Sequence, residues 1–237
     1  MRDEQRDRCN SNQGDNGENA LSTLESAESY VAASAAAGAA SDGRRTPFSN
    51  SFATFLTWGE EADLIRPIED FPFFLRPPDG YGDEHEAWFD EASSRWYKST
   101  YPNQFGLAWG RNGSATAGEY LTRLVLQNQY FGDAIRLIAL VRCNQKLRVL
   151  TSQPHVPGEA ALSGEIQQWF RTLGYNRLEI DDSVAWYRKP ENLLVADAHE
   201  GNVIRTPAGM LFAIDLNLMK PCGEMLEVVL SMLNASF

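Results

Sequence analysis

Two segments carry apolar residues at the spacing of an α-helix. Residues 118–131 place one set of side chains on a common face: Tyr120, Leu121, Leu124, Val125 and Asn128. Residues 163–173 form the second helical segment, and Gly174 follows it as a stop signal. Thr116 precedes the first segment, and Glu119 stands three residues later, which is the spacing of a capping box. The sequence therefore predicts two helices.

Short runs of β-branched, aromatic and aliphatic residues, bounded by turn residues, predict strands. These runs are 86–90, 95–100, 134–141, 147–152, 184–188, 193–196, 202–205 and 211–214. Residues 67–77 are rich in proline and phenylalanine, and we expect them to be a docked extended segment. Strands come before, between and after the two helices, so the predicted fold class is α+β.

Residues 1–50 differ in composition from the rest of the chain. They contain Tyr30 and Phe48 but none of the six tryptophans, and they are rich in Asn, Ser, Glu, Gly and Ala. Such a segment has little apolar area with which to offset the entropy of ordering. We therefore expect a disordered tail over 1–50 and a folded domain over 55–237, although good helix formers make a short helix at 19–37 the alternative.

Charge and motif content exclude several classes of function. The formal net charge is −11, and no run of five or more Lys or Arg residues occurs, so nucleic acid is not an expected partner. No segment approaches the ~20 apolar residues of a membrane span, and no signal peptide is recognisable. The three cysteines lie far apart, which disfavours a disulfide framework or a Cys-ligated zinc site. We expect a soluble, cytoplasmic protein.

The residues best suited to catalysis or metal binding lie between 195 and 216. Asp197 and Asn202 are on a loop between two predicted strands, and Asp215 ends the apolar run L-F-A-I-D. A hairpin between Asn202 and Asp215 would bring two carboxylates and an amide to one edge of a sheet. Oxygen donors of this kind suit Mg²⁺, and a nearby carboxylate can orient an attacking hydroxyl or accept its proton.

The pattern D-x₄-N-x₁₂-D resembles protein kinases and aminoglycoside-type phosphotransferases. The resemblance implies ATP and Mg²⁺ as cofactors, with Asp197 as catalytic base and Asn202 and Asp215 as metal ligands. His199 lies two residues after Asp197, where many protein kinases have a lysine that contacts the transferred phosphoryl group, so the resemblance implies a catalytic part for His199.

The upstream half of the chain extends this resemblance. Lys98 lies where these families place the phosphate-binding lysine, and Glu119 lies where they place its ion-pair partner. Gly80 and Gly82 would belong to the glycine loop that covers the phosphates. The segment that contains Gln153 and His155 resembles the hinge whose backbone binds adenine.

The whole-body resemblance is to the small kinase-like domains of phage and plasmid polyvalent proteins, over about residues 60–221. The shared motifs are G-x-E-H, E-Y-L-x-R-L…N-x-x-F-x-D, S-Q-P and D-A-H-x-x-N, which start here at Gly82, Glu119, Ser152 and Asp197. They imply a minimal two-lobed kinase-like fold, with an N-lobe at about 60–152, a hinge at 152–158 and a reduced C-lobe at 159–237.

The implied function is ATP-dependent phosphoryl transfer to a hydroxyl of a protein Ser, Thr or Tyr, or of a small molecule. The chain ends 22 residues after Asp215, where full protein kinases continue, so a partner or a homodimer is expected to complete the short C-lobe. Asp-Leu-Asn also stands at 215–217, where kinases have Asp-Phe-Gly. Two alternatives remain: a nucleotide-binding scaffold without turnover, and a purely structural interaction protein.

Overall fold

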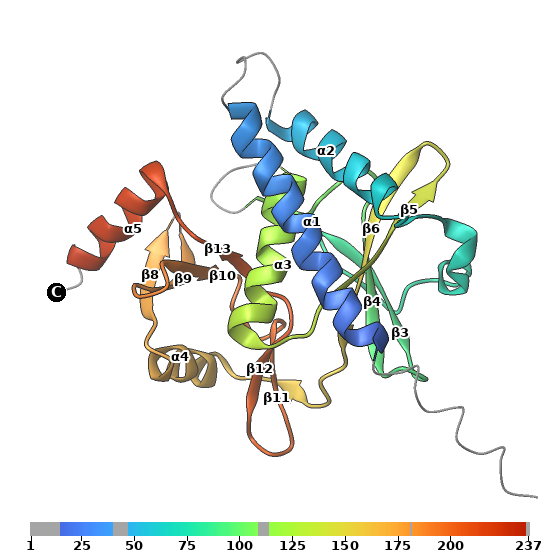
Figure 1. Cartoon of the computed structure of the whole chain (residues 1–237). Coiled ribbons are helices and arrows are strands. Elements are labelled where there is room, and N and C mark those ends of the chain that lie inside the picture. The colour runs from blue at the N-terminus through green and yellow to red at the C-terminus, as the bar shows by residue number, and fades with distance from the viewer. Residues whose placement is uncertain (1–14, 40–46, 109–113, 181, 236–237) are drawn as a thin grey trace, which may run out of the picture. The chain divides into compact units, whose positions relative to one another are not determined.

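The computed structural model describes residues 15–39, 47–108, 114–180 and 182–235, which are arranged in two compact units (Figure 1). Unit 1 comprises residues 1–105 and 134–153, and unit 2 comprises residues 106–133 and 154–237. Each unit contains both strands and helices, so the predicted α+β class is confirmed. Among the described residues, none of the helices combines the length and the apolar character that a membrane crossing requires.

Unit 1 is built on one six-stranded sheet. Its strands are β1 (Ile65–Pro67), β5 (Arg136–Cys143), β6 (Lys146–Pro154), β4 (Arg95–Thr100), β3 (His85–Asp90) and β2 (Gly80–Tyr81), given in their order across the sheet. β1 runs parallel to β5, whereas the β2–β3, β3–β4 and β5–β6 pairs are antiparallel. Two antiparallel hairpins therefore form most of the sheet.

An aromatic layer covers one face of this sheet. Its phenylalanines are Phe71 and those of the 3₁₀ helix η2 (Pro72–Leu75). This helix and the 3₁₀ helix η1 (Ile68–Asp70) take the place of the extended segment expected at 67–77. The ring of Phe73 lies 5.1 Å from that of Tyr97, and the ring of Phe74 lies 4.8 Å from that of Trp88. Pro72 favours this local turn because its fixed φ suits the first position of a helix.

Two N-terminal helices also belong to unit 1: α1 (Asp15–Ala39) and α2 (Pro47–Glu61). α1 packs against both α2 and β5. α1 spans the helix that was the alternative expectation at 19–37, whereas residues 1–14 and 40–46 of the expected tail over 1–50 lie outside the described residues. The physical reason is a narrow apolar stripe: Leu24, Ala27 and Val31 follow the helical period and are at most 2% exposed.

Unit 2 contains a four-stranded antiparallel sheet. In spatial order its strands are β13 (Asn217–Met219), β10 (Leu193–Ala196), β9 (Ser183–Arg188) and β8 (Asn176–Ile180). Helix α4 (Ser163–Thr172) lies over one face, where the rings of Phe170 and Trp186 stack at 5.1 Å. Helix α5 (Gly223–Ala235), which the sequence did not predict, covers the opposite face with Val229 and Leu233.

A smaller antiparallel sheet lies in the same unit. It consists of β12 (Leu211–Ala213), β11 (Val203–Arg205) and β7 (Glu159–Ala160). Val203 and Ala213 pair directly and are buried in the same core cluster as Trp186. The β11–β12 hairpin is therefore anchored to the main core of unit 2.

Helix α3 (Ala117–Phe131) changes the expected division of the chain. The N-lobe was expected to run continuously over 60–152, but residues 106–133 belong to unit 2. The reason is packing: α3 lies against β13, and Leu126 is buried in the cluster around Trp186. The boundary between Gln153 and Pro154 falls within the predicted hinge at 152–158.

Candidate phosphotransferase site

The loop from Asp197 to Asn202 lies between a buried strand and a short hairpin. All four residues of β10 are buried, and Asp197 directly follows this strand. Pairing of Ala196 with Asn217 brings the residues after Asp215 alongside the start of the loop. At the other end of the loop, the N–H of Ile214 donates to the carbonyl of Asn202 at 2.9 Å. Two separate strand registers thus bring Asp197, Asn202 and Asp215 to one edge of unit 2.

Asp197 adopts a conformation that few residues other than glycine take. Its φ is +62°, in the left-handed region, which aspartate and asparagine tolerate better than most residues. Asn202 stabilises this turn, because its Nδ2 donates to the backbone oxygen and to Oδ2 of Asp197, both at 2.9 Å. Neither bond involves Oδ1 of Asn202. Because Nδ2 is turned toward Asp197, this neutral oxygen lies on the other side of the amide group.

His199 contacts the second carboxylate oxygen of Asp197. The N–H of Gly201 donates to Nδ1 of His199 at 3.0 Å, so Nδ1 is the acceptor and the proton of the neutral ring is on Nε2. Nε2 lies 3.3 Å from Oδ1 of Asp197. Both carboxylate oxygens of Asp197 are therefore contacted from within the loop.

Helix α3 supports the backbone next to Asp215. Gln127 is 1% exposed, and its Oε1 accepts the N–H of Leu216 at 3.2 Å. Its Nε2 donates to Oδ2 of Asp133 at 2.8 Å. This residue was not among the predicted site residues, although Gln127 follows Tyr120 and Leu124 at helical spacing. A polar side chain on an apolar stripe is the signal of a buried hydrogen bond.

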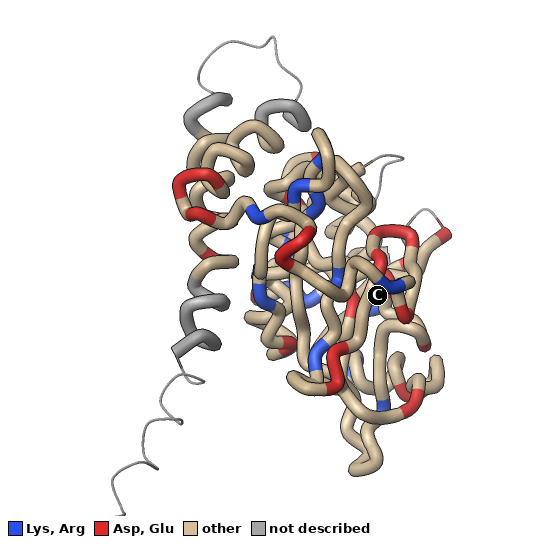
Figure 2. The backbone as a smooth tube through the Cα atoms, turned by 90° about the vertical axis from the view of Figure 1, so that its right-hand side faces the viewer, with Lys and Arg blue, Asp and Glu red and all other residues tan. Residues whose placement is uncertain are grey.

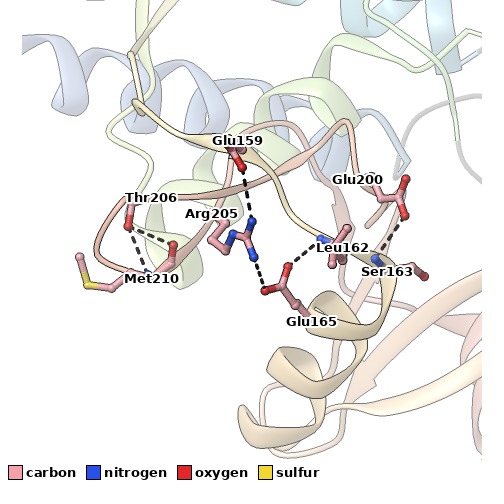
Figure 3. A network of polar contacts seen from close by, with 8 residues as sticks. All are labelled: Glu159, Leu162, Ser163, Glu165, Glu200, Arg205, Thr206 and Met210. Carbon is pink, nitrogen blue, oxygen red and sulfur yellow. Dashed lines mark hydrogen bonds and ion pairs between the residues drawn. The ribbon is translucent and has the colours of Figure 1, made fainter.

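The loop is also tied to the start of α4 (Figure 3). Oε1 of Glu200 accepts the N–H of Ser163 at 3.2 Å. Two residues further along α4, Glu165 accepts the N–H of Leu162 at 2.8 Å and the Nη1–H of Arg205 at 2.9 Å. The Leu162 N–H, and then Arg205, hold the pKa of Glu165 below its ordinary value against the opposing effect of desolvation.

Lys98, Gly80 and Gly82 lie in unit 1. Lys98 is on β4 and pairs with Ala87 on β3, which in turn pairs with Gly80 on β2. Directly paired residues share a face of a sheet, so Lys98 lies on the face opposite Tyr97 and the aromatic layer. The N–H of Gly82 closes the β2–β3 turn on the carbonyl of His85 at 2.9 Å. Phosphate binding by these residues stays a prediction.

Glu119 forms the expected capping box. Its Oε2 accepts the backbone N–H of Thr116 at 2.7 Å, and its own N–H donates to Oγ1 of Thr116 at 3.2 Å. Glu119 belongs to unit 2 and Lys98 to unit 1. The implied ion pair between Glu119 and Lys98 stays a prediction.

The two hinge residues differ in their surroundings. Gln153 is near the end of β6 and is 4% exposed, whereas His155 lies just after this strand and is exposed. The side chain of His155 is thus accessible, while that of Gln153 is packed into the protein. Adenine binding at this segment stays a prediction.

The donor atoms beside Asp197 fit a magnesium ion that is bound together with phosphates. Oδ1 of Asn202 and the carboxylate of Asp215 are hard oxygen donors, and Mg²⁺ is usually held by one or two protein oxygens, phosphates and waters. The described part of the chain has no group of three or more His, Cys, Asp or Glu residues placed to hold a metal.

Basic residues are dispersed over the described backbone. Figure 2 shows Lys and Arg singly or in short stretches between acidic residues. The formal net charge of the chain is −11. A polyphosphate would consequently depend on individual side chains and backbone N–H groups rather than on a broad basic surface.

Comparison with known proteins gives one match. The model of a family described as the Serine/Threonine/Tyrosine Kinase found in polyvalent proteins matches residues 108–219. This range contains α3, the loop with Asp197 and Asn202, and Asp215, but not Lys98. No curated protein and no solved structure matches the chain significantly. The match supports a kinase-like function in general. The expected resemblance is thus confirmed: residues 108–219 are similar to the kinases of polyvalent proteins.

Proposed function

We propose that this protein is a phosphotransferase that uses ATP and Mg²⁺ to phosphorylate a hydroxyl group. The observation that carries the proposal is the convergence of Asp197, Asn202 and Asp215 within the stretch that matches the kinase family. Magnesium, when bound, would neutralise charge on the phosphates. Positioning and charge neutralisation supply most of the catalysis in phosphoryl transfer.

Each of the three residues has a distinct role in this proposal. Asp197 accepts a hydrogen bond from the acceptor hydroxyl, and takes its proton as the new oxygen–phosphorus bond forms and the bond to ADP breaks. Asn202 holds the Asp197 carboxylate through Nδ2 and offers Oδ1 to the metal. Asp215 supplies the second metal-binding oxygen. His199, at 3.3 Å from Oδ1 of Asp197, leaves that oxygen a second lone pair for the hydroxyl.

The remaining predicted residues bind the nucleotide. Lys98 contacts the α- and β-phosphates, with Gly80 and Gly82 on the turn that precedes β3. The backbone of the segment with Gln153 and His155 binds adenine. The acceptor that the family description favours is a Ser, Thr or Tyr side chain of a protein, and a small-molecule hydroxyl is the alternative acceptor.

The test is ADP production and autophosphorylation by the full chain with ATP and Mg²⁺. We expect activity in the wild type, a loss of at least about 100-fold in Asp197→Asn, and a similar loss in Asp215→Ala. Asp63→Asn is the matched control, because Asp63 is an exposed aspartate with a similar φ of +52° in unit 1. Equal ADP production by the wild type and Asp197→Asn would refute the proposal.

One observation favours a second candidate, a nucleotide-binding scaffold without turnover. Both oxygens of the Asp197 carboxylate are contacted by Asn202 and His199, and each contact uses a lone pair with which a base could accept a proton. A scaffold predicts a rise in melting temperature with ATP and Mg²⁺, its loss in Asp215→Ala, and no ADP. Absence of any thermal shift would instead favour a purely structural interaction protein.

A further inference from the structure

The N-terminus of α4 is joined to the loop that carries Asp197 and Asn202. Glu200 is the fourth residue of this loop, and its Oε1 accepts the N–H of Ser163 at 3.2 Å. Further hydrogen bonds join Asp197, His199, Gly201 and Asn202 to one another, and the N–H of Ile214 on the adjoining hairpin donates to Asn202. Glu200 therefore links the middle of the loop to a separate helix (Figure 3).

The helix end that receives Glu200 is itself fixed by two further residues. Glu165 accepts the N–H of Leu162 through Oε2 and an Arg205 N–H through Oε1. Arg205 is on β11, three residues after Asn202, and its Nη2 also lies 3.4 Å from Oε2 of Glu159 on β7. Arg205 on β11 thus contacts α4, and α4 in turn contacts Glu200 of the loop.

The loop needs external support because its conformation is strained. Asp197 has a left-handed φ of +62°, and Asp197, His199, Glu200 and Gly201 are exposed. An exposed loop with an unfavourable dihedral persists only when surrounding contacts hold it. The bonds from Asn202 act inside the loop, whereas Glu200 and the pair of Glu165 with Arg205 hold it from outside.

We propose that Glu200, Glu165 and Arg205 are positioning residues that hold the loop of Asp197 and Asn202 against the N-terminus of α4. The three side chains touch neither nucleotide nor acceptor. They act by keeping the Asp197 carboxylate in place, and the kinetic part of this proposal rests on the proposed phosphotransferase function.

The direct test measures the loop itself and does not need catalysis. Hydrogen exchange is followed by NMR at the amides of His199, Gly201 and Asn202, which all donate within the loop. In Glu200→Ala and Arg205→Met we expect exchange about two- to fivefold faster than in the wild type. This is the effect expected when an exposed polar contact or ion pair is lost. Glu224→Ala, at an exposed glutamate in the first turn of α5, should leave exchange unchanged.

Conservative variants distinguish a positioning role of these side chains from an effect of their charge. Glu200→Gln keeps an acceptor oxygen and Arg205→Lys keeps a cationic donor, so both should retain loop protection close to that of the wild type. Glu165→Gln keeps one acceptor but loses the ion pair, and we expect intermediate exchange. If Arg205→Met does not fold, Glu200→Ala and Glu165→Gln provide the same comparison.

The kinetic test measures whether the variants change kcat, the KM for ATP, or both. We expect kcat to fall about two- to fivefold in Glu200→Ala and Arg205→Met, with the KM for ATP unchanged within about twofold. Unchanged exchange in these two variants would overturn the proposal, and so would a fall in kcat without faster exchange. If the wild type makes no ADP, the phosphotransferase proposal fails, and the exchange data alone decide the positioning role.

Discussion

The side-chain amide of Asn202 donates from Nδ2 to both the backbone carbonyl and Oδ2 of Asp197, at 2.9 Å in each case. Two bonds from one amide fix the carboxylate and the left-handed backbone of the same residue. The sequence predicted that both residues belong to one site, but it assigned Asn202 only to the metal. The structure adds that Asn202 also orients Asp197.

Replacement of Asn202 by aspartate tests this dual role. Asn202→Asp removes the Nδ2 donor and places a second carboxylate beside that of Asp197, so we expect a loss of about 1 kcal/mol in the free energy of unfolding. Chemical denaturation monitored by tryptophan fluorescence measures it. Asn144→Asp is the control, because Asn144 also has a left-handed φ of +57° but lies on the β5–β6 turn. Equal losses in the two variants would contradict the specific role of Asn202.

Gln127 is predicted to be essential for the stability of unit 2. Gln127→Leu leaves the buried Leu216 N–H and the Asp133 carboxylate without the partner that each now has on Gln127. The expected loss is about 2–3 kcal/mol in the free energy of unfolding. Gln168→Leu, on the exposed side of α4, should change it by less than about 0.5 kcal/mol. A neutral Gln127→Leu variant would show that these bonds contribute little.

Helix α1 provides a test of the N-terminal part of the fold. Leu24 is 0% exposed, so Leu24→Ala should cost about 2–4 kcal/mol through lost burial and the resulting cavity. A residue in an unstructured tail would show no such cost. The exposed neighbour Ser26 serves as control, since Ser26→Ala should not destabilise the protein measurably. Denaturant midpoints of the two variants give the comparison.

Asp79 should make the stability of unit 1 depend on pH. Its carboxylate accepts hydrogen bonds from Arg76 at 2.7 and 2.8 Å and from the N–H of Phe89 at 2.8 Å. The Arg76 bond, followed by that from Phe89, lowers the pKa of Asp79 below its ordinary value of 3.8. A lowered folded-state pKa gives a stabilisation that is present above pH 3.8 and is lost as the pH falls through the folded-state pKa.

The comparison of Asp79→Asn with the wild type measures this effect. The variant should melt at a lower temperature near pH 6, and the difference should shrink as the pH is lowered below 3.8. Asp83→Asn, on the exposed turn before β3, is the control. A difference between wild type and Asp79→Asn that is constant from pH 6 to pH 3 would contradict the role assigned to the carboxylate.

Much of the secondary structure could be predicted because its signals are local. The helical period of Tyr120, Leu121 and Leu124 predicted α3 within one residue of its observed start. Likewise, short runs of β-branched, aromatic and aliphatic residues predicted β4 and β10 with their observed bounds. β8 was missed although Leu178 and Ile180 alternate with charged residues, because a five-residue run with only two apolar side chains is a weak signal.

The site could be predicted only as a set of residues. The hairpin spacing of Asn202 and Asp215 indicated that the three residues meet, and the resemblance of their order to that of protein kinases implied phosphotransferase chemistry. The hydrogen-bond partners of Gln127 and Glu200 were not predictable, because they are backbone groups far away in the sequence, at Leu216 and Ser163.

The sequence by itself determined the α+β class, the capping box of α3 and the identity of the three candidate site residues. These features depend on local periodicity, on side-chain chemistry and on spacing along the chain. Only the tertiary structure decided that α1 is a packed helix, that α3 belongs to unit 2, and that Glu200 of the Asp197 loop bonds to the start of α4. Those outcomes depend on which apolar faces bury each other and which backbone groups find partners, and both are set by segments distant in sequence.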